Sequence, residues 1–348
     1  MADYSLSRID QVIIHHIGHK GRGGSVAFSR AFADISQERV KRLLHTFFFR
    51  HFDVDAYYRF SFPTENFRLN PVYQIITAYF ENREDLFNTG VDLAKLLFDV
   101  SEHPLIKDGD FFIVHFSNLP YGHQRCDGLG LFKCESQQAF LKLLCADDEI
   151  QLQAEEGIHP EKPDKACLIL HTEKEDGYRV LCTDKTNAKE EALYWKDSFL
   201  QLQPCADAYH QTRHFLADTR MFMQQEVTEQ GNMSRTDQID LWNRSVNFFK
   251  SNTQFRQADF ELEVMQDPES IAQFRSFRET QSAERGIPLS GDFEISDEAV
   301  KRQARLFKSV LKLDRNFHVY IHGDRSMIES GVDADGRKFY KIYYEEER

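Results

Sequence analysis

The sequence has no apolar run long enough to cross a membrane. None of its stretches approaches the roughly 18 consecutive apolar residues that a membrane-spanning helix requires. The first ten residues, MADYSLSRID, also lack the apolar centre of a secretion signal. These absences argue against a membrane protein and against a secreted one, and we expect a protein of the cytoplasm.

Cysteine is scarce and scattered along the chain. The six cysteines include no C-x-x-C pair, the spacing that often marks a zinc site or a redox motif. Buried, reduced thiols therefore fit the sequence better than a zinc site or a disulfide framework. The six are Cys126, Cys134, Cys145, Cys167, Cys182 and Cys205.

Recognisable catalytic motifs are missing as well. The sequence contains no nucleophile elbow, no H-E-x-x-H zinc motif and no Walker loop. Asp164 and the pair Glu173-Lys174 flank an expected strand and offer a weak nuclease interpretation, but hairpin turns often carry such polar residues. We predict no catalytic residues, no cofactor and no enzymatic activity.

Two weak binding signals lie near the N-terminus. His15, His16 and His19 suggest a metal site, but neighbouring strand residues point to opposite faces of a sheet, and we predict no metal. HKGRGG, residues 19–24, is a basic glycine-rich turn whose backbone could approach a phosphate. It matches neither a P-loop nor a dinucleotide fingerprint, so a surface loop is the better interpretation.

Apolar and aromatic side chains, by contrast, are plentiful. The chain is 41% hydrophobic and 13% aromatic, with 30 phenylalanines, which indicates a folded globular protein. Its 348 residues leave room for about two domains. We predict an α+β protein in which residues 1–203 form an α+β domain with antiparallel hairpins. Residues 204–348 form a helical domain that ends in a basic helix and a small antiparallel β-meander.

Periodicity and capping residues place the expected elements. Asn70-Pro71 joins an N-cap to a proline at the first helical position, and Ser234-x-x-Asp237 is a capping box. The expected strands of the first domain are 8–17, 110–116, 127–133, 149–154, 166–172 and 178–184. Its expected helices are 36–52, 71–81, 136–145 and one that Asn82 caps and that ends near 102. A further helix is expected at 190–202, at the end of the first domain, and the second domain has expected helices at 206–229, 236–251, 260–266 and 268–285.

Charge is distributed unevenly along the chain, which carries a net charge of −13. Residues 147–191 hold thirteen acidic side chains against six basic ones, a net charge of −7. Residues 300–341 hold ten basic side chains against five acidic ones, a net charge of +5. A protein polarised in this way can meet an anion with one end only.

The basic segment starts with an expected helix, capped by Ser296, on which Lys301, Arg305 and Lys308 share one side. Three alternating stretches, 308–313, 317–322 and 339–344, then predict short antiparallel strands. The face of these strands expected to be apolar holds Leu311, Leu313, Phe317, Val319, Ile321, Tyr340, Ile342 and Tyr344.

The opposite face interleaves lysine and histidine with aromatic rings, a composition typical of nucleic-acid surfaces. An ordinary solvated face, with basic residues complementing the helix dipole, is the alternative. The candidate DNA-binding residues are Lys301, Arg302, Arg305, Lys308, Lys312, Arg315, His318, Tyr320, His322 and Lys341.

Several stretches follow one another in a recognisable order along the chain. They are HPLIKDGDFFIVHF (103–116), GLGLFK (128–133), CLILHTEKEDG (167–177), YWKDSFLQL (194–202), FKSVLKLDRNFHVYIHGD (307–324) and residues 338–344. Their order resembles that in the bacterial nucleoid-associated proteins of the YejK/NdpA type, in the branch found in Bacteroidetes-like bacteria, and the resemblance covers nearly the whole chain.

The resemblance implies a cytoplasmic protein that associates with the nucleoid, binds DNA and contacts chromosome machinery such as a type II topoisomerase. It brings no catalytic residues. We therefore expect binding to the backbone phosphates of DNA, double-stranded by preference, with little dependence on sequence. Two alternatives stay open: a protein-interaction adaptor that reaches DNA indirectly, and a metal-dependent nuclease.

Overall fold

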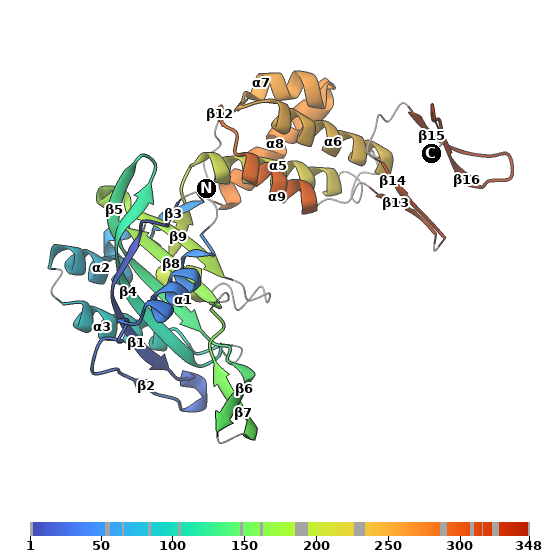
Figure 1. The fold of residues 1–348 in the computed structure, drawn as a ribbon. Coiled ribbons are helices and arrows are strands. Elements are labelled where there is room, and N and C mark those ends of the chain that lie inside the picture. Colours follow the sequence, from blue (N-terminus) through green and yellow to red (C-terminus); the bar gives the residue numbers. More distant parts are fainter. Residues whose placement is uncertain are drawn as a thin grey trace. The chain divides into compact units, whose positions relative to one another are not determined.

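A computed structural model describes residues 3–52, 56–64, 66–82, 85–103, 106–146, 149–160, 163–184, 194–225, 234–285, 291–306, 310–314, 316–321 and 327–346. The chain divides into two units, Met1–Cys205 and Ala206–Arg348 (Figure 1). We refer to them as the N-terminal and the C-terminal unit. No helix within these ranges is long and apolar enough to span a lipid bilayer.

An eight-stranded antiparallel sheet forms the centre of the N-terminal unit, in the order β10-β3-β9-β8-β5-β4-β1-β2. Its long central hairpin, β4 with β5, was expected from the two apolar runs that start at Asp110 and Asp127, and both strands are longer than predicted. The strands are β1 (Arg8–Ile17), β2 (Val26–Ala27), β3 (Tyr57–Phe60), β4 (Gly109–Tyr121), β5 (Gln124–Cys134), β8 (Lys165–Leu170), β9 (Arg179–Asp184) and β10 (Leu202–Pro204).

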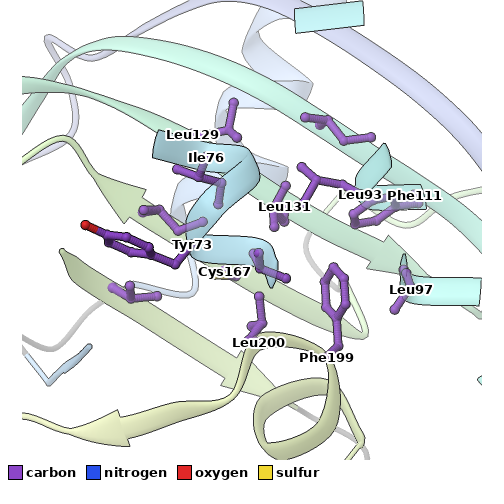
Figure 2. Close-up of a cluster of buried hydrophobic side chains, with 14 of the residues drawn as sticks. Tyr73, Ile76, Leu93, Leu97, Phe111, Leu129, Leu131, Cys167, Phe199 and Leu200 are labelled. Atoms are coloured by element: carbon purple, nitrogen blue, oxygen red, sulfur yellow. The ribbon is translucent and has the colours of Figure 1, made fainter. Parts of the chain in front are cut away.

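Both faces of this sheet are covered. On one face, α2 (Pro71–Glu81), α3 (Leu86–Asp99) and the π-helical turn Tyr194–Leu200 bury a large apolar cluster, part of which Figure 2 shows around Ile76, Leu131 and Phe199. On the other face, α1 (Glu38–Phe49) packs its phenylalanines against β4 and β5. Because the central strands are buried on both sides, their sequences read as continuous apolar runs rather than alternating ones.

Local sequence signals set most helix ends. Asn70 accepts a hydrogen bond from the backbone N of Tyr73 (3.0 Å), and Pro71 is the first residue of α2, as predicted. Helix α3 begins later than predicted, because Asp85 rather than Asn82 caps it by accepting from the backbone N of Asn88 (3.3 Å). Short 3-10 turns at Lys20–Arg22, Phe67–Leu69 and Lys174–Asp176 complete the unit.

Two predicted helices of the first domain were wrong. The segment 136–145 contains β6 (Gln138–Ala146), which pairs with β7 (Glu149–Gly157) over nine residue pairs. Its leucines fit a helical spacing, but non-local pairing overrides such weak propensities. The predicted helix 190–202 is, in its described part, the π-helical turn Tyr194–Leu200 followed by strand β10, and residues 190–193 lie outside the described ranges.

The C-terminal unit is mainly helical around a phenylalanine-rich core that includes Phe215, Phe249, Phe255 and Phe260. The predicted capping box is present, since Ser234 and Asp237 each accept from the other's backbone N. The helices are α5 (Ala208–Gln225), α6 (Arg235–Ser251), α7 (Gln257–Phe260) with the π-helical turn Glu261–Met265, α8 (Pro268–Arg285) and α9 (Asp297–Leu306).

Three two-stranded pairs accompany these helices, and together they confirm the α+β class. The first joins β11 (Gln254–Phe255) to β12 (Phe293–Glu294). The others are two C-terminal hairpins, β13 (Val310–Leu313) with β14 (Phe317–Tyr320), and β15 (Ile328–Val332) with β16 (Lys338–Ile342). Four strands thus occupy the region in which the sequence indicated three, because β15 contains Gly331 and lacks a clear alternation.

Candidate nucleic-acid interface

Helix α9 presents a basic side to solvent. The hydroxyl of Ser296 accepts a hydrogen bond from the backbone N of Ala299 (3.4 Å), so the predicted N-cap is in place. Ala299 and Val300 are buried and fix the orientation of the helix. Lys301 and Arg305 are exposed, and their spacing of four residues places them on the same side of α9.

Arg302 lies on α9 as well, but its charge is compensated. Its Nε donates to Oε1 of Glu298, one turn earlier, at 3.0 Å. Both side chains are partly exposed, so this ion pair is a weak one. It still makes Arg302 a poorer candidate for a phosphate contact than Lys301 or Arg305.

The β13–β14 hairpin divides its residues between two faces, as the alternation predicted. Lys312 lies opposite His318, and Val310 lies opposite Tyr320. The side chains of Lys312, His318 and Tyr320 are exposed. The alternate residues Leu311 and Val319 pack against the core of the C-terminal unit, which holds the polar face outward.

The ammonium group of Lys341 already interacts with two side chains of the β15–β16 hairpin, Glu329 and Tyr343. It lies opposite Glu329, and the ammonium nitrogen is 3.7 Å from the Glu329 carboxylate. The same nitrogen donates to the hydroxyl of Tyr343 (2.6 Å), which in turn donates to Glu329 (2.8 Å). The hydrogen bond to Tyr343 and the Glu329 carboxylate raise the pKa of Lys341. Sequence reasoning missed Glu329 as a partner because β15 was not predicted.

The expected apolar face of these strands is only partly buried. Leu311 and Ile321 are buried, and Tyr340 packs partly against the core. Phe317, Ile342 and Tyr344 are exposed, contrary to the prediction. The reason is that the strands form two separate hairpins, each of which turns only some of its residues toward the helices.

Three candidates, Lys308, Arg315 and His322, lie outside the described residues. Among the described candidates, Lys301, Arg305 and Lys312 combine exposure with the absence of an ion pair in the part of the chain that the structure describes. Glu345 and Glu346 follow β16 and are exposed, so the end of the described chain is acidic. Among the described candidate residues, the positive charge without an ion pair is therefore carried by α9 and β13.

The glycine-rich turn closes on itself. The backbone N atoms of Arg22 and Gly24 both donate to the carbonyl of His19, and that of Gly23 donates to Lys20. A Cβ atom on residue 24 would lie only 2.6 Å from the backbone nitrogen of His19. Glycine at this position therefore allows the two backbone segments to approach closely. These amide groups are used within the turn rather than presented to a phosphate.

Two of the three N-terminal histidines have partners of their own. His15 is buried and accepts from the backbone N of Ser29 (3.1 Å), whereas His16 is paired with Asp110 (2.9 Å). Throughout the described ranges no three His, Cys, Asp or Glu side chains gather as metal ligands do.

The residues of the nuclease interpretation lie apart. Asp164 precedes β8 and accepts from the backbone N atoms of Glu135 (2.6 Å) and Ser136 (3.0 Å). Glu173 and Lys174 follow β8 at its other end, where Lys174 is paired with Glu81 (2.8 Å). The structure gives these side chains separate structural roles.

A buried ionic cluster, which sequence reasoning missed, lies between β5 and β8. Lys133 and Lys165 are directly opposite each other and fully buried. Lys133 donates to Glu135 (2.9 Å) and Lys165 to Asp184 (3.2 Å), and both ammonium groups lie within 5.5 Å of the Tyr194 ring centre. Burial lowers the pKa of Lys133 and raises that of Tyr194. Each ammonium group has a carboxylate partner, and these partners are only 4% (Glu135) and 11% (Asp184) exposed, so we assign the cluster a structural role in the sheet.

Comparison with protein families and with curated proteins gives one match. The sequence model of a family described as nucleoid-associated protein YejK matches residues 13–346, nearly the whole chain. No curated protein matches the chain.

Proposed function

Because the chain belongs to the family of nucleoid-associated proteins of the YejK type, we propose that it binds DNA directly through backbone phosphates and without catalysis. The family supports a role at the nucleoid. The observation that carries the proposal is the set of three exposed cations Lys301, Arg305 and Lys312 in the C-terminal unit of a strongly acidic protein.

The geometry of α9 suits a charged polymer. Lys301 and Arg305 are separated by about 6 Å along the helix axis, given a rise of about 1.5 Å per residue. Duplex DNA carries one phosphate charge for about every 1.7 Å of its axis, so two cations at this spacing can each reach a phosphate. Such contacts hold the protein on DNA without reading bases, which accounts for weak dependence on sequence.

The β13–β14 hairpin would contribute a second kind of contact. Lys312 and His318 lie side by side on its exposed face, with Tyr320 two residues further along β14. An exposed tyrosine ring can pack on a sugar or on an unpaired base. Binding to duplex and to single-stranded DNA therefore needs to be compared directly.

The test is fluorescence anisotropy of labelled duplex and single-stranded DNA, titrated with the pure protein across a range of salt concentrations. The triple variant Lys301→Glu, Arg305→Glu, Lys312→Glu should bind more weakly. The slope of log affinity against log salt should fall by about three, since each phosphate contact contributes roughly 0.9 to that slope.

A matched control comes from α1, where Arg39, Lys41 and Arg42 are exposed in the N-terminal unit. Reversing these three charges to glutamate changes the net charge equally and should leave the salt slope unchanged. Equal loss of binding in both variants would mean that total charge, rather than this surface, governs the interaction. An unchanged affinity in the folded α9 and β13 variant would refute the proposed interface.

Failure of the wild-type protein to bind DNA at low salt would favour the adaptor hypothesis. The protein would then reach the nucleoid through a partner such as a type II topoisomerase, and pull-down of that partner should survive nuclease treatment. Cleavage of DNA in magnesium or manganese that EDTA abolishes would instead contradict the non-enzymatic part of the proposal.

A further inference from the structure

The β6–β7 hairpin is a two-stranded sheet of its own within the N-terminal unit. Nine residue pairs, from Gln138 opposite Gly157 to Ala146 opposite Glu149, run without a register shift. Figure 1 shows β6 and β7 extending as a ribbon from one end of the large sheet. We call these residues, 138–146 and 149–157, the β6–β7 ribbon.

One face of the ribbon is mainly apolar, and the other, which we call the polar face, combines charged and amide side chains with Phe140 and Leu144. On the polar face Lys142 and Glu155 form an ion pair at 2.9 Å. The apolar face consists of Leu141, Leu143 and Cys145 of β6 with Ile150, Leu152 and Ala154 of β7, and all six are exposed. The exposed fractions are 71% for Leu141, 63% for Leu143, 72% for Ile150 and 67% for Leu152.

Nothing in the described part of the protein covers this face. None of its six side chains belongs to, or packs against, the apolar clusters that form the cores of the two units. A hairpin of two strands is at best marginally stable in water unless one face is packed. An exposed apolar patch of this extent on an otherwise well-packed unit is typical of an interaction surface.

We propose that two copies of this chain associate by packing their β6–β7 apolar faces against each other about a two-fold axis. In a two-fold contact residue i of one copy meets residue j of the other and j meets i, so only residues near the axis meet their own counterparts, and a charged residue there would meet a like charge. The six apolar residues carry no charge, and the ion pair Lys142–Glu155 is on the opposite face. Glu156, opposite Ala139, is on the same face but lies near the end of the ribbon, away from the central pair Leu143 and Leu152. The face is therefore compatible with itself.

The available area also fits a second copy. At roughly 100 Å² for each exposed aliphatic side chain, the face offers on the order of 500 Å² per copy and about 1,000 Å² for two. A specific protein interface needs about 1,000 Å² in total, so the dimer is expected to be a reversible one at the small end of the range. This inference is independent of DNA binding, since it concerns the N-terminal unit only.

The first measurement is sedimentation equilibrium of the full chain from about 1 to 200 μM without DNA. We expect a monomer–dimer equilibrium. In the double variant Leu143→Glu, Leu152→Lys, whose two substitutions lie opposite each other and so preserve cross-strand attraction, the dissociation constant should rise by more than about 100-fold. The matched control Leu144→Glu, Gln151→Lys places the same charges at the next opposed pair, on the polar face, and should still dimerise.

A second measurement uses the unaltered chain and does not depend on the folding of a variant. Cys145 is an exposed free thiol on the apolar face. Its alkylation rate, followed by peptide mass mapping, should fall as the protein concentration rises through the dissociation constant. A chain that stays monomeric at 200 μM, a dimer that survives the Leu143 and Leu152 substitutions, or a Cys145 rate independent of concentration would each overturn the proposal. Capture of a different protein or of lipid by a monomeric chain would do the same.

Discussion

At the scale of single residues, the buried lysines of β5 and β8 determine how much this sheet tolerates substitution. Lys133 is fully buried and donates to Glu135, to the hydroxyl of Tyr194 (3.2 Å) and to the carbonyl of Lys107 (2.7 Å). Removing one partner of a buried pair leaves the other charge without compensation. Substituting one member of this cluster is therefore expected to destabilise the folded protein strongly.

We expect Lys133→Met to lower the free energy of unfolding by about 3 kcal/mol, because the substitution keeps most of the side-chain volume but removes the cationic partner of Glu135. Of its side-chain partners among the described residues, the buried carboxylate then keeps only the hydrogen bond from the Tyr194 hydroxyl (2.7 Å). Urea unfolding followed by circular dichroism would measure the change. The control is Lys142→Met, which breaks an ion pair of similar length on the exposed ribbon and should cost at most about 1 kcal/mol. Equal costs at the two sites would show that burial does not set the strength of the Lys133 pair.

Single-residue signals in the sequence were informative where the chemistry is local. Ser296, Asn70 and the Ser234–Asp237 box cap the predicted helices because a cap depends only on the next three residues. Ion pairs across the sheet could not be predicted in this way. The partners of Lys341 and Lys165 are set by strand register, which joins residues that are far apart in the sequence.

At the scale of elements, the carboxylate of Glu261 links the π-helical turn Glu261–Met265 to α8 through an ion pair with Arg275. Glu261 accepts from Nε of Arg275 (2.7 Å) and from the side-chain amide of Gln257 (2.8 Å). The hydrogen bond from Arg275 holds the pKa of Glu261 below its usual value of 4.5. A carboxyl group with a lowered pKa in the folded state contributes stability above its unfolded pKa and loses it as the pH falls through the folded one.

Glu261→Gln should therefore lower the free energy of unfolding by roughly 1 kcal/mol at pH 7. The expected loss is small because the side chain of Arg275 is half exposed, and solvent weakens its interaction with Glu261. The difference between wild type and variant should shrink below about pH 4.5 and vanish once the wild-type carboxyl is protonated. Urea titrations at several pH values would measure it. Glu263→Gln, at an exposed position of the same turn, provides the control. A difference that stays constant down to pH 2 would contradict the assigned role of the charge.

Elements were predicted well where apolar runs and caps agreed, as for β1, which spans the predicted residues Arg8–Ile17, and α8, which spans Pro268–Arg285. The prediction failed for β6, whose leucines, lysine and alanine favour a helix locally. It also omitted β3, because a strand of four residues is too short to show a clear alternation of apolar and polar side chains. In both cases the outcome depends on a partner strand that local sequence does not reveal.

At the scale of the whole molecule, the two units have separate apolar cores: the N-terminal unit has one cluster on each face of its sheet, and the C-terminal unit has one around the phenylalanines of its helices. We expect residues 206–348 to fold alone and to bind DNA with the same salt slope as the full chain. Residues 1–205 alone should fold but not bind. Circular dichroism and anisotropy of both fragments would test this, and DNA binding by the N-terminal fragment would contradict the assignment of the interface to α9 and β13.

The order of strands in the large sheet has a consequence for how the protein is made. Strand β3 ends at Phe60, whereas its neighbours β9 and β10 begin at Arg179 and Leu202. At a synthesis rate of about 5–20 residues per second, the ribosome needs roughly 6–24 s to deliver the chain between the end of β3 and the start of β9. During that interval β3 has no neighbouring strand to pair with, whereas β4 can already pair with β1 and β5, and β5 with β8, as these strands emerge. The N-terminal unit should therefore complete its sheet late on the ribosome, with β3 left without a partner strand until β9 emerges.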